Sequence, residues 1–412
     1  MDSASSFNRI LAFSRRKLLA ALGGVPAVTA QGSPAYGAGS IYTRMFGMRP
    51  LLCARGHTTA YGGSLMPAEV MRAMIEANDH FVDLNELNQA AGKRIAALMQ
   101  AEAALVSAGA FSAMVLGAAA CLTGKDAAKV EALPHPTWPK RVCLIQKAHR
   151  ENYDRAYRTA GMVIRECETR EQLAAAIGPD TAMIAALAST EKAAMNDRSI
   201  MKPQEFVELG KRSGVPTLID AAAEIPPAAT LTRFTKMGFD LVAISGGKGL
   251  LGPQATGILA GRRDLIEAAT LNHSPNTGVG RGMKVGKEEI VGLVAAMELY
   301  LSRDRELVHE VWNRRVRYLV NELQGVPGLR AEHRSAADGH DHGFLEVLLT
   351  WDPQVIPLTG QQLTAKLKSG EPRMVYYPEY GGEHSGVLQT RSMKDGEEII
   401  AARRLKQVFA ER

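Results

Sequence analysis

The chain has 412 residues, 46% of them hydrophobic, and no tandem repeat, so it can bury a large core and should divide into a larger and a smaller domain. Its formal net charge is +6, but residues 1–38 carry four basic residues and one acidic residue, which leaves +3 on the remainder. This small charge, without a basic stretch interleaved with aromatic residues, argues against nucleic-acid binding. The four cysteines (Cys53, Cys121, Cys143 and Cys167) follow neither a metal-binding nor a disulfide pattern, and we predict no metal site.

The first 38 residues have the composition of a targeting segment. Ser14-Arg15-Arg16-Lys17-Leu18-Leu19 is a twin-arginine pattern, and a weakly apolar run to Ala30 follows it. The run is too short to span a membrane stably. We therefore expect this segment to direct export to the periplasm. The alternative is an ordinary basic extension on a cytoplasmic protein.

Residues 39–66 are rich in turn-forming residues and form an N-terminal arm before a helix expected to begin near Pro67. Further along, a short strand is expected to end at Ser107, and a helix should start near Ala110. Free backbone N–H groups and the positive end of the helix dipole then meet at one place, which suits a phosphate group. Ser107, Gly109 and Ala110 are the candidate residues for binding it.

The run from Arg141 to Gln146 predicts a buried strand that opens onto polar residues. His149 should then stand at the edge of the sheet, where it could lie over a flat ligand; a plain surface position is the alternative. A further apolar strand is expected from Thr181 to Ala188.

Two short β-rich runs, Val215 to Ile219 and Leu241 to Ile244, flank a helical stretch from Leu231 to Met237. This order predicts a βαβ crossover, in which the two strands are parallel. Parallel strands bring their carboxyl ends to one edge of the sheet, where ligands bind in open α/β folds. Asp220 and the loop from Ser245 to Lys248 should therefore face the same site.

An acid at one strand end and a lysine just past the next is the arrangement that pyridoxal 5'-phosphate chemistry needs. Lys248 would form a Schiff base with the aldehyde of the cofactor, and Asp220 would keep the ring nitrogen protonated so that the ring withdraws electrons. The attraction between two such charges is roughly 4 kcal/mol at about 4 Å in partly screened surroundings. In this hypothesis His149 is the residue that stacks on the ring.

Small residues surround the lysine. Glycines on both sides of Lys248 leave room for close approach, and Ala222, with its alanine neighbours, lets a flat ring lie against the sheet. A Walker phosphate loop would need Ser or Thr after the lysine, where this chain has Gly249. The remaining alternative is an exposed lysine in a turn.

Two stretches, Leu218-Ile-Asp-Ala-Ala-Ala-Glu-Ile-Pro-Pro and Ile244-Ser-Gly-Gly-Lys-Gly-Leu-Leu-Gly-Pro-Gln, resemble the family of L-seryl-tRNA(Sec) selenium transferase. Its relatives include ammonia-lyases that act on glucosaminate and its phosphate. The resemblance extends from about Arg49 to the C-terminus. It implies an α/β protein of fold type I pyridoxal phosphate architecture, with a large, mostly parallel-sheet domain at 67–285 and a small C-terminal α/β domain at 286–412.

The resemblance also implies a homodimer or a larger homo-oligomer, because fold type I sites are usually built at a subunit interface. Arg281 and Lys284 match a basic segment that often reaches the cofactor phosphate of the neighbouring subunit; a solvated helix start is the alternative. Arg373 matches an arginine that faces the active site. A guanidinium group can pair with a substrate carboxylate through two parallel hydrogen bonds, although a surface position at a strand start is equally compatible with the sequence.

We expect the protein to be a lyase that releases ammonia by α,β-elimination from a hydroxy amino acid or a 2-amino-2-deoxy sugar acid. Lys248 would remove the Cα proton as general base, hydroxide would leave from Cβ, and hydrolysis would give a 2-keto acid and ammonia. Racemisation, aldol cleavage and transamination share the early steps.

Two other functions remain open. Selenium transfer onto seryl-tRNA is disfavoured by the modest charge, since tRNA demands many phosphate contacts. A non-catalytic pyridoxal phosphate-binding or scaffold protein is the other. The expected partner is a small amino acid or amino sugar acid; neither nucleic acid nor a stable membrane anchor is expected.

Overall fold

The computed structural model describes residues 36–335 and 344–411. The chain divides after Pro50 into two compact units. In the first unit, the short helix α3 (Ile41–Phe46) is capped by Ser40, whose hydroxyl accepts a hydrogen bond from the N–H of Thr43 at 3.2 Å. Residues 1–35 of the expected targeting segment, which include its twin-arginine pattern, lie outside the described residues.

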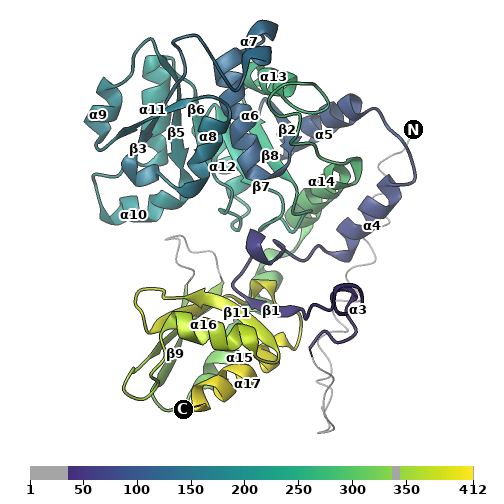
Figure 1. Cartoon of the computed structure of the whole chain (residues 1–412), viewed down its shortest axis with the longest axis vertical. Helices are drawn as coiled ribbons and strands as arrows, with labels where there is room; N and C mark the ends of the chain where they lie inside the picture. The colour runs from purple at the N-terminus through teal and green to yellow at the C-terminus, as the bar shows by residue number, and fades with distance from the viewer. Residues whose placement is uncertain (1–35, 336–343, 412) are drawn as a thin grey trace. The chain divides into compact units, whose positions relative to one another are not determined.

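The larger sheet of the second unit has seven strands in the order β2-β8-β7-β6-β5-β3-β4 (Figure 1). All neighbouring strands are parallel except β8, which is antiparallel to both β2 and β7. Strand β2 therefore runs in the same direction as the other parallel strands. The seven strands are β2 (Ala103–Ser107), β3 (Val142–Gln146), β4 (Val163–Cys167), β5 (Thr181–Leu187), β6 (Thr217–Asp220), β7 (Leu241–Ser245) and β8 (Gly257–Gly261).

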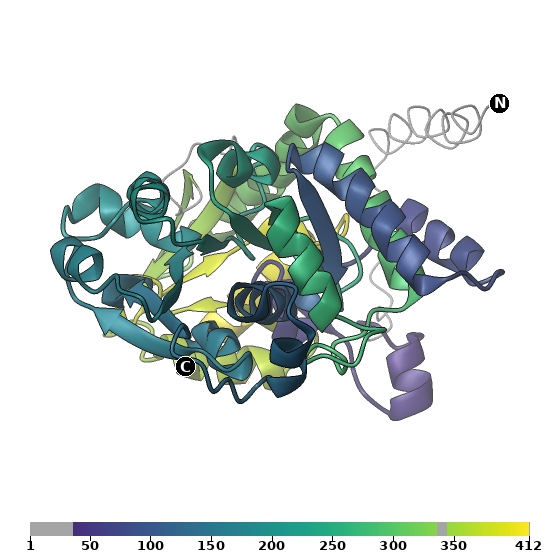
Figure 2. The same cartoon turned by 90° about the horizontal axis from the view of Figure 1, so that it is seen from above.

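Helices cover both faces of this sheet, because successive side chains of each strand point to opposite sides and each side builds its own core (Figure 2). One face packs against α5 (Leu84–Met99), α11 (Pro203–Ser213), α12 (Thr230–Met237) and α14 (Lys287–Ser302). The other packs against α6 (Gly109–Thr123), α8 (Arg155–Thr159) and α13 (Arg263–Asn272). Four further helices, α4 (Ala68–Ala77), α7 (Ala127–Ala132), α9 (Arg170–Ala175) and α10 (Glu191–Asn196), belong to this part of the chain.

The predicted crossover is confirmed, since β6, α12 and β7 follow one another and the two strands pair in parallel. The predicted α/β class with a large, mostly parallel sheet is confirmed as well. Helix α14 was expected in the small domain. Its buried residues Ile290, Leu293 and Met297 instead belong to the core on one face of the large sheet, so the large domain extends beyond the predicted limit at residue 285.

A second sheet of five strands, in the order β1-β11-β12-β10-β9, forms the small domain. Strand β1 lies in the segment expected to be an arm, and it pairs in parallel with β11 because its inward side chains, Leu52 and Ala54, are fully buried there. The elements are β1 (Leu51–Ala54), β9 (Leu329–Ser335), β10 (Leu345–Trp351), β11 (Arg373–Pro378), β12 (Ser385–Leu388), α15 (Arg305–Leu323), α16 (Gly360–Ser369) and α17 (Glu397–Ala410). Within the described ranges, we find no helix with both the length and the apolar character needed to cross a membrane.

Candidate active site

Three strands end side by side at one edge of the large sheet. Strand β2 ends at Ser107, β6 at Asp220 and β7 at Ser245. Ser107 and Ser245 are both paired with Gly257, the first residue of β8, which lies between them. The residues that follow these strands therefore gather at one place, which we call the sheet-edge site and define by Ser107, Asp220, Ser245 and Lys248.

Asp220 is buried at the end of β6, with 6% of its surface exposed. Its Oδ1 accepts a hydrogen bond from the N–H of Ala222 at 2.9 Å. Burial raises the pKa of Asp220, while the Ala222 N–H and the charge of Lys248 oppose that rise. The carboxylate is thus held in a fixed orientation, beside a cation that favours its ionised form.

Lys248 lies on a tight loop after β7 and is half-buried. Gly246 anchors the loop, because its N–H donates to the carbonyl of Thr256 at 2.9 Å. The next turn closes when the N–H of Leu251 donates to the carbonyl of Lys248 at 3.0 Å. A side chain at Gly249 would overlap the carbonyl oxygen of Ile225, so only glycine fits there. This packing fixes the backbone that carries the lysine.

Helix α6 begins directly after β2, at the same edge of the sheet. Ser107 is fully buried, and its hydroxyl donates to the carbonyl of Gly109 at 3.0 Å. Ala108, at the N-cap position, provides no side-chain cap, so the first N–H groups of this 15-residue helix remain available to an anion. A side chain at Gly257 would collide with Gly109 and Ala110. The helix start therefore lies against the first residue of β8, within the sheet-edge site.

His149 does not have the predicted position over a ring. It is 1% exposed, its Nε2 lies 3.0 Å from the carbonyl oxygen of Met201, and its Nδ1 accepts from the N–H of Leu187 at 3.0 Å. Phe206 packs against the ring edge at 4.7 Å between centroids. Burial lowers the pKa of His149 to about 4. The stacking prediction is wrong, because this buried imidazole instead hydrogen-bonds the backbone of Leu187 at the end of β5 and contacts the carbonyl of Met201.

Glu151, two residues further on, reaches the sheet-edge site instead. Burial and the nearby charge of Asp220 raise the pKa of Glu151 to about 7, and the charge of Lys248 opposes that rise. We did not predict this residue from the sequence. The only available signal was its place just after a buried strand whose end was expected at this edge.

Arg281 and Lys284 are exposed on the loop before α14. They are available to a ligand or to a second subunit, and their predicted contact with a phosphate remains a prediction. Lys287, which the sequence analysis did not place in the site, donates to the carbonyl of Ala77 at 2.6 Å and pairs with Glu288 at 2.6 Å.

Arg373 opens β11 in the small domain. Its Nε–H donates to the carbonyl of Lys368 at 3.1 Å, which holds the side chain against the end of α16. The position at a strand start agrees with the sequence analysis. Its role toward a substrate carboxylate remains a prediction.

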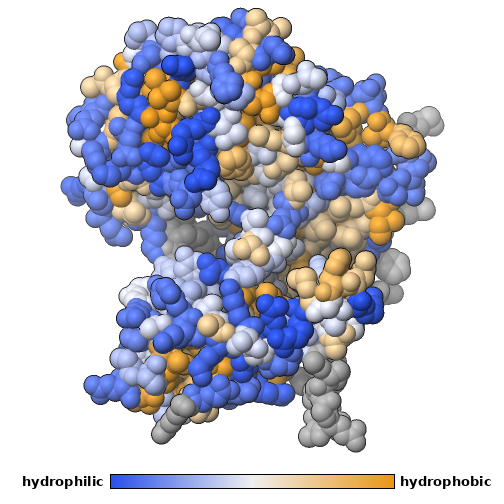
Figure 3. Space-filling view, viewed as in Figure 1, coloured by the Kyte–Doolittle hydropathy of each residue, from blue (hydrophilic) through white to orange (hydrophobic). Residues whose placement is uncertain are grey.

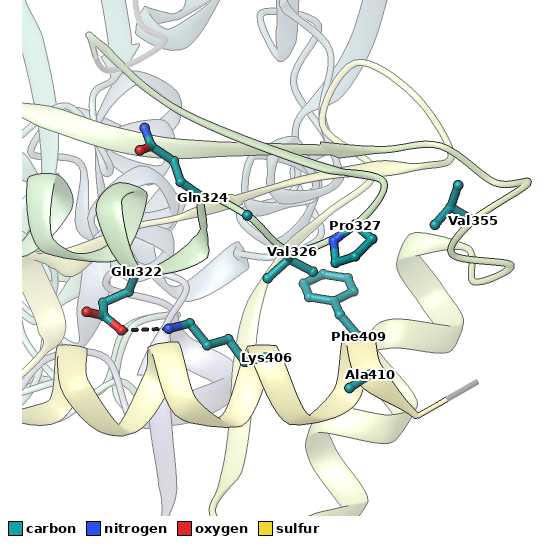
Figure 4. Close-up of a pocket in the computed structure, with 9 residues that line it drawn as sticks. Glu322, Gln324, Val326, Pro327, Val355, Lys406, Phe409 and Ala410 are labelled. Carbon is teal, nitrogen blue, oxygen red and sulfur yellow. Dashed lines mark hydrogen bonds and ion pairs between the residues drawn. The ribbon is translucent and has the colours of Figure 1, made fainter.

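A separate pocket lies on the small domain, with a volume of about 440 Å³ (Figure 4). An ion pair between Lys406 and Glu322, 2.6 Å long, borders it, and Val326, Pro327 and Phe409 form its apolar wall. None of the residues of the sheet-edge site lines this pocket. It is therefore not where the chemistry of Lys248 and Asp220 takes place.

The side chains of the sheet-edge site fit pyridoxal 5'-phosphate. A primary amine and a buried carboxylate lie at the same edge of the sheet, and the uncapped start of α6 provides N–H groups for a phosphate. Ala221 and Ala222 follow Asp220, and their small side chains leave room for a flat ring between the amine, the carboxylate and the helix start. Amine, carboxylate and anion-binding turn are the three groups that this cofactor requires of a protein.

Comparison with known proteins agrees with this assignment. The family model of L-seryl-tRNA selenium transferase matches residues 156–313. A 5'-C-glycyluridine monooxygenase-decarboxylase from a Streptomyces species is 32% identical over 88% of this chain and 90% of its own length. A D-glucosaminate-6-phosphate ammonia lyase from Salmonella typhimurium is 27% identical over 90% of this chain and 98% of its own.

A solved structure of D-glucosaminate-6-phosphate ammonia-lyase superimposes with a TM-score of 0.78 at 25% identity, covering 90% of this chain and 98% of the other. Fold and site together define a fold type I pyridoxal phosphate enzyme. More closely, the chain belongs to the L-seryl-tRNA selenium transferase-like family, which includes the ammonia-lyase relatives.

Proposed function

We propose that the protein is a pyridoxal phosphate-dependent lyase that releases ammonia by α,β-elimination from a hydroxy amino acid or a 2-amino-2-deoxy sugar acid, leaving a 2-keto acid. The observation that carries the proposal is that the buried Asp220 ends β6 and Lys248 follows β7, so that both lie at the same edge of the parallel sheet. The similarity to an ammonia lyase over nearly its whole length supports this reaction type.

Each residue of the site has a separate role in this reaction. When bound, the cofactor supplies a ring that withdraws electrons from the carbon next to the substrate amino group. Asp220 would hold the ring nitrogen, and the start of α6 at Gly109 and Ala110 would hold the phosphate. Lys248 would anchor the cofactor. It would then act as general base that removes the proton from Cα of the substrate, and as general acid that donates this proton in a later step. Because the lysine sits on a loop fixed by glycine packing, its amine stays close to the reacting carbon.

The Streptomyces relative supports a second candidate, oxygen-dependent decarboxylation of an amino acid. Selenium transfer onto seryl-tRNA has less support, because the match to the selenium transferase of Moorella thermoacetica, 35% identical, covers only 28% of that protein.

A panel of amino acids and amino sugar acids, phosphorylated and free, tests these functions. Elimination predicts equal amounts of ammonia and 2-keto acid with no oxygen consumed, whereas decarboxylation predicts carbon dioxide and oxygen uptake. An absorption band between about 300 and 500 nm that borohydride reduces should accompany either activity. Absence of the band after addition of pyridoxal phosphate would contradict the proposal and favour a scaffold protein.

Arg373 is proposed to bind the substrate carboxylate. Arg373→Ala should raise KM about tenfold to hundredfold with a smaller change in kcat, since a hydrogen-bonded charge pair contributes about 1.5–3 kcal/mol. Steady-state kinetics on the most active compound of the panel measures this. Arg373→Lys is the matched variant, because it keeps the charge and loses the paired hydrogen bonds. An unchanged KM in both variants would rule out this role.

A homo-oligomer is proposed as well. Helix α4 and the residues after it expose Met71, Ile75, Phe81 and Val82, and apolar side chains gather over α4 in Figure 3. Exposed apolar groups of this extent are typical of interaction surfaces. A second subunit there would agree with the expected reach of Arg281 and Lys284 into a neighbouring site.

Export through the twin-arginine pathway is proposed from the pattern at residues 14–19. Changing both Arg15 and Arg16 to Lys should retain the protein in the cytoplasm, because the pair is the recognised feature of such signals. Fractionation of cells producing each variant measures the distribution, with Arg9→Lys as the matched control. Periplasmic protein in equal amount from the double variant would refute the proposal.

A further inference from the structure

A tight turn follows β1 and leads out of the small sheet. The N–H groups of Tyr61 and Gly63 both donate to the carbonyl of Thr58, each at 3.0 Å. Gly62 and Gly63 have φ angles of +94° and +76°, which residues with a side chain rarely adopt. The backbone of residues 58–63, which we call the 58–63 turn, therefore has a defined shape.

One side of the 58–63 turn touches the peptide bond that carries Lys248. A Cβ atom built on Gly63 would lie 2.7 Å from the carbonyl oxygen of Gly247, the residue directly before the lysine. The same atom would lie 3.1 Å from Cγ of Gln254, whose Cα in turn packs against Gly247. The Nε2–H of Gln254 donates to the carbonyl of Thr59 at 3.0 Å. A displacement of this turn would thus displace the backbone of the lysine.

The other side of the turn leads to Arg373. The ring of Tyr61 has the Nζ of Lys368 at 5.6 Å from its centre, which is the geometry of a cation–π contact. Lys368 lies near the end of α16, and its carbonyl accepts the Nε–H of Arg373 at 3.1 Å. Tyr61 therefore packs on the residue whose backbone holds the guanidinium group.

The two ends of this path belong to different sheets. Lys248 follows a strand of the large sheet, whereas Arg373 opens a strand of the small one. An amino acid presents its amine and its carboxylate on one carbon, so a site that handles both groups must keep lysine and guanidinium at a fixed spacing. Small errors in such a spacing slow a reaction strongly. A contact path between the sheets is what can maintain it.

We propose that the 58–63 turn sets the spacing between Lys248 and Arg373, with Gln254 and Tyr61 as the positioning residues on its two sides. The inference rests on the proposed function, since it assumes that Lys248 and Arg373 act on the two ends of one amino acid. Gln254 acts through the lysine and Tyr61 through the arginine. Their variants should therefore change different kinetic constants.

Gln254→Glu keeps the length of the side chain, but its ionised carboxyl group has no donor for the carbonyl of Thr59. The kcat of this variant should fall about twofold to tenfold with little change in KM, as expected for one hydrogen bond that orients the catalytic lysine. Gln354→Glu, an exposed change in the small domain, is the matched control and should keep both constants. Steady-state kinetics on the most active compound of the panel measures them.

Tyr61→Leu keeps an apolar side chain but removes the aromatic ring. It should raise KM about twofold to fivefold with kcat unchanged, the effect of one exposed cation–π contact. Tyr61→Phe keeps the ring and should match the wild type. In an Arg373→Ala background, Tyr61→Leu should not raise KM further, because a residue that acts only through Arg373 has no effect once Arg373 is absent.

Hydrogen exchange of the cofactor-free protein gives a readout that needs no activity. The loop of Lys248 is closed by hydrogen bonds from the N–H groups of Gly246 and Leu251. Peptides covering residues 246–252 should exchange about twofold to tenfold faster in Gln254→Glu, since one hydrogen bond fewer holds the loop against the 58–63 turn. Gln354→Glu should exchange as the wild type does.

Unchanged exchange of residues 246–252 in Gln254→Glu would overturn the proposal. So would additive effects of Tyr61→Leu and Arg373→Ala on KM, or a Tyr61→Phe variant as impaired as Tyr61→Leu. A wild-type protein without activity on the whole panel would contradict the proposed function instead, and the exchange experiment would still decide whether Gln254 holds the loop of Lys248.

Discussion

Lys248→Ala should abolish turnover and remove the visible absorption of the cofactor-loaded protein while leaving the fold intact. The lysine amine is the group that would bond to the cofactor and move the Cα proton. Its side chain is half-buried, so truncation costs little packing. Absorption between about 300 and 500 nm, with peptide mapping of a borohydride-reduced adduct, measures the first effect.

A control variant and an unfolding measurement accompany the test of Lys248→Ala. Lys236→Ala, an exposed change on α12, should keep both the spectrum and the activity of the wild type. Thermal unfolding of Lys248→Ala should match the cofactor-free wild-type protein. A spectrum of Lys248→Ala that equals the wild type after borohydride treatment would place the cofactor on another amine and overturn the assignment.

Asp220→Ala should keep measurable cofactor binding and lose turnover by a factor on the order of 10² to 10³, the usual effect of removing one preorganised electrostatic partner. Without the carboxylate, the ring nitrogen is not held protonated, and negative charge at Cα is less stabilised. Single-turnover kinetics at saturating cofactor measures the chemical step apart from binding.

The matched control for this variant is Asp79→Ala, which removes an exposed carboxylate. It should leave turnover unchanged. Asp220→Asn separates charge from shape, because the amide can still accept the N–H of Ala222. If Asp220→Asn and Asp220→Ala both retain near wild-type turnover, Asp220 does not have the proposed role.

The sequence predicted the centre of the fold well because its signals there are local. Two β-rich runs around an amphipathic helix allow only a parallel crossover, and the parallel direction alone brings Asp220 and the Lys248 loop to one edge. The start of α6 was predicted for the same reason, since an apolar strand followed by a small-residue turn has few other solutions.

Other features depend on contacts between distant parts of the chain. Whether His149 or Glu151 faces the site is decided by the twist of a turn and by the partners Leu187 and Met201, which lie about 40 to 50 residues away. Strand β8 is glycine-rich, and its antiparallel place in the sheet is defined only by its pairing with β2 and β7. Helix α14 could not be assigned to a domain from its own pattern, because its buried face is defined by the core it joins.

The pairing of β1 with β11 determines when the edge of the small sheet can form during synthesis. Leu51 lies opposite Arg373, so the edge of the small sheet closes only when the chain is almost fully synthesised. Joining segments so far apart is entropically costly and slows folding. A fragment that starts after residue 54 would leave β11 with an unpaired edge, a template for aggregation. Any shortened form made for study should therefore keep residues 51–54, although they lie far in sequence from the domain they complete.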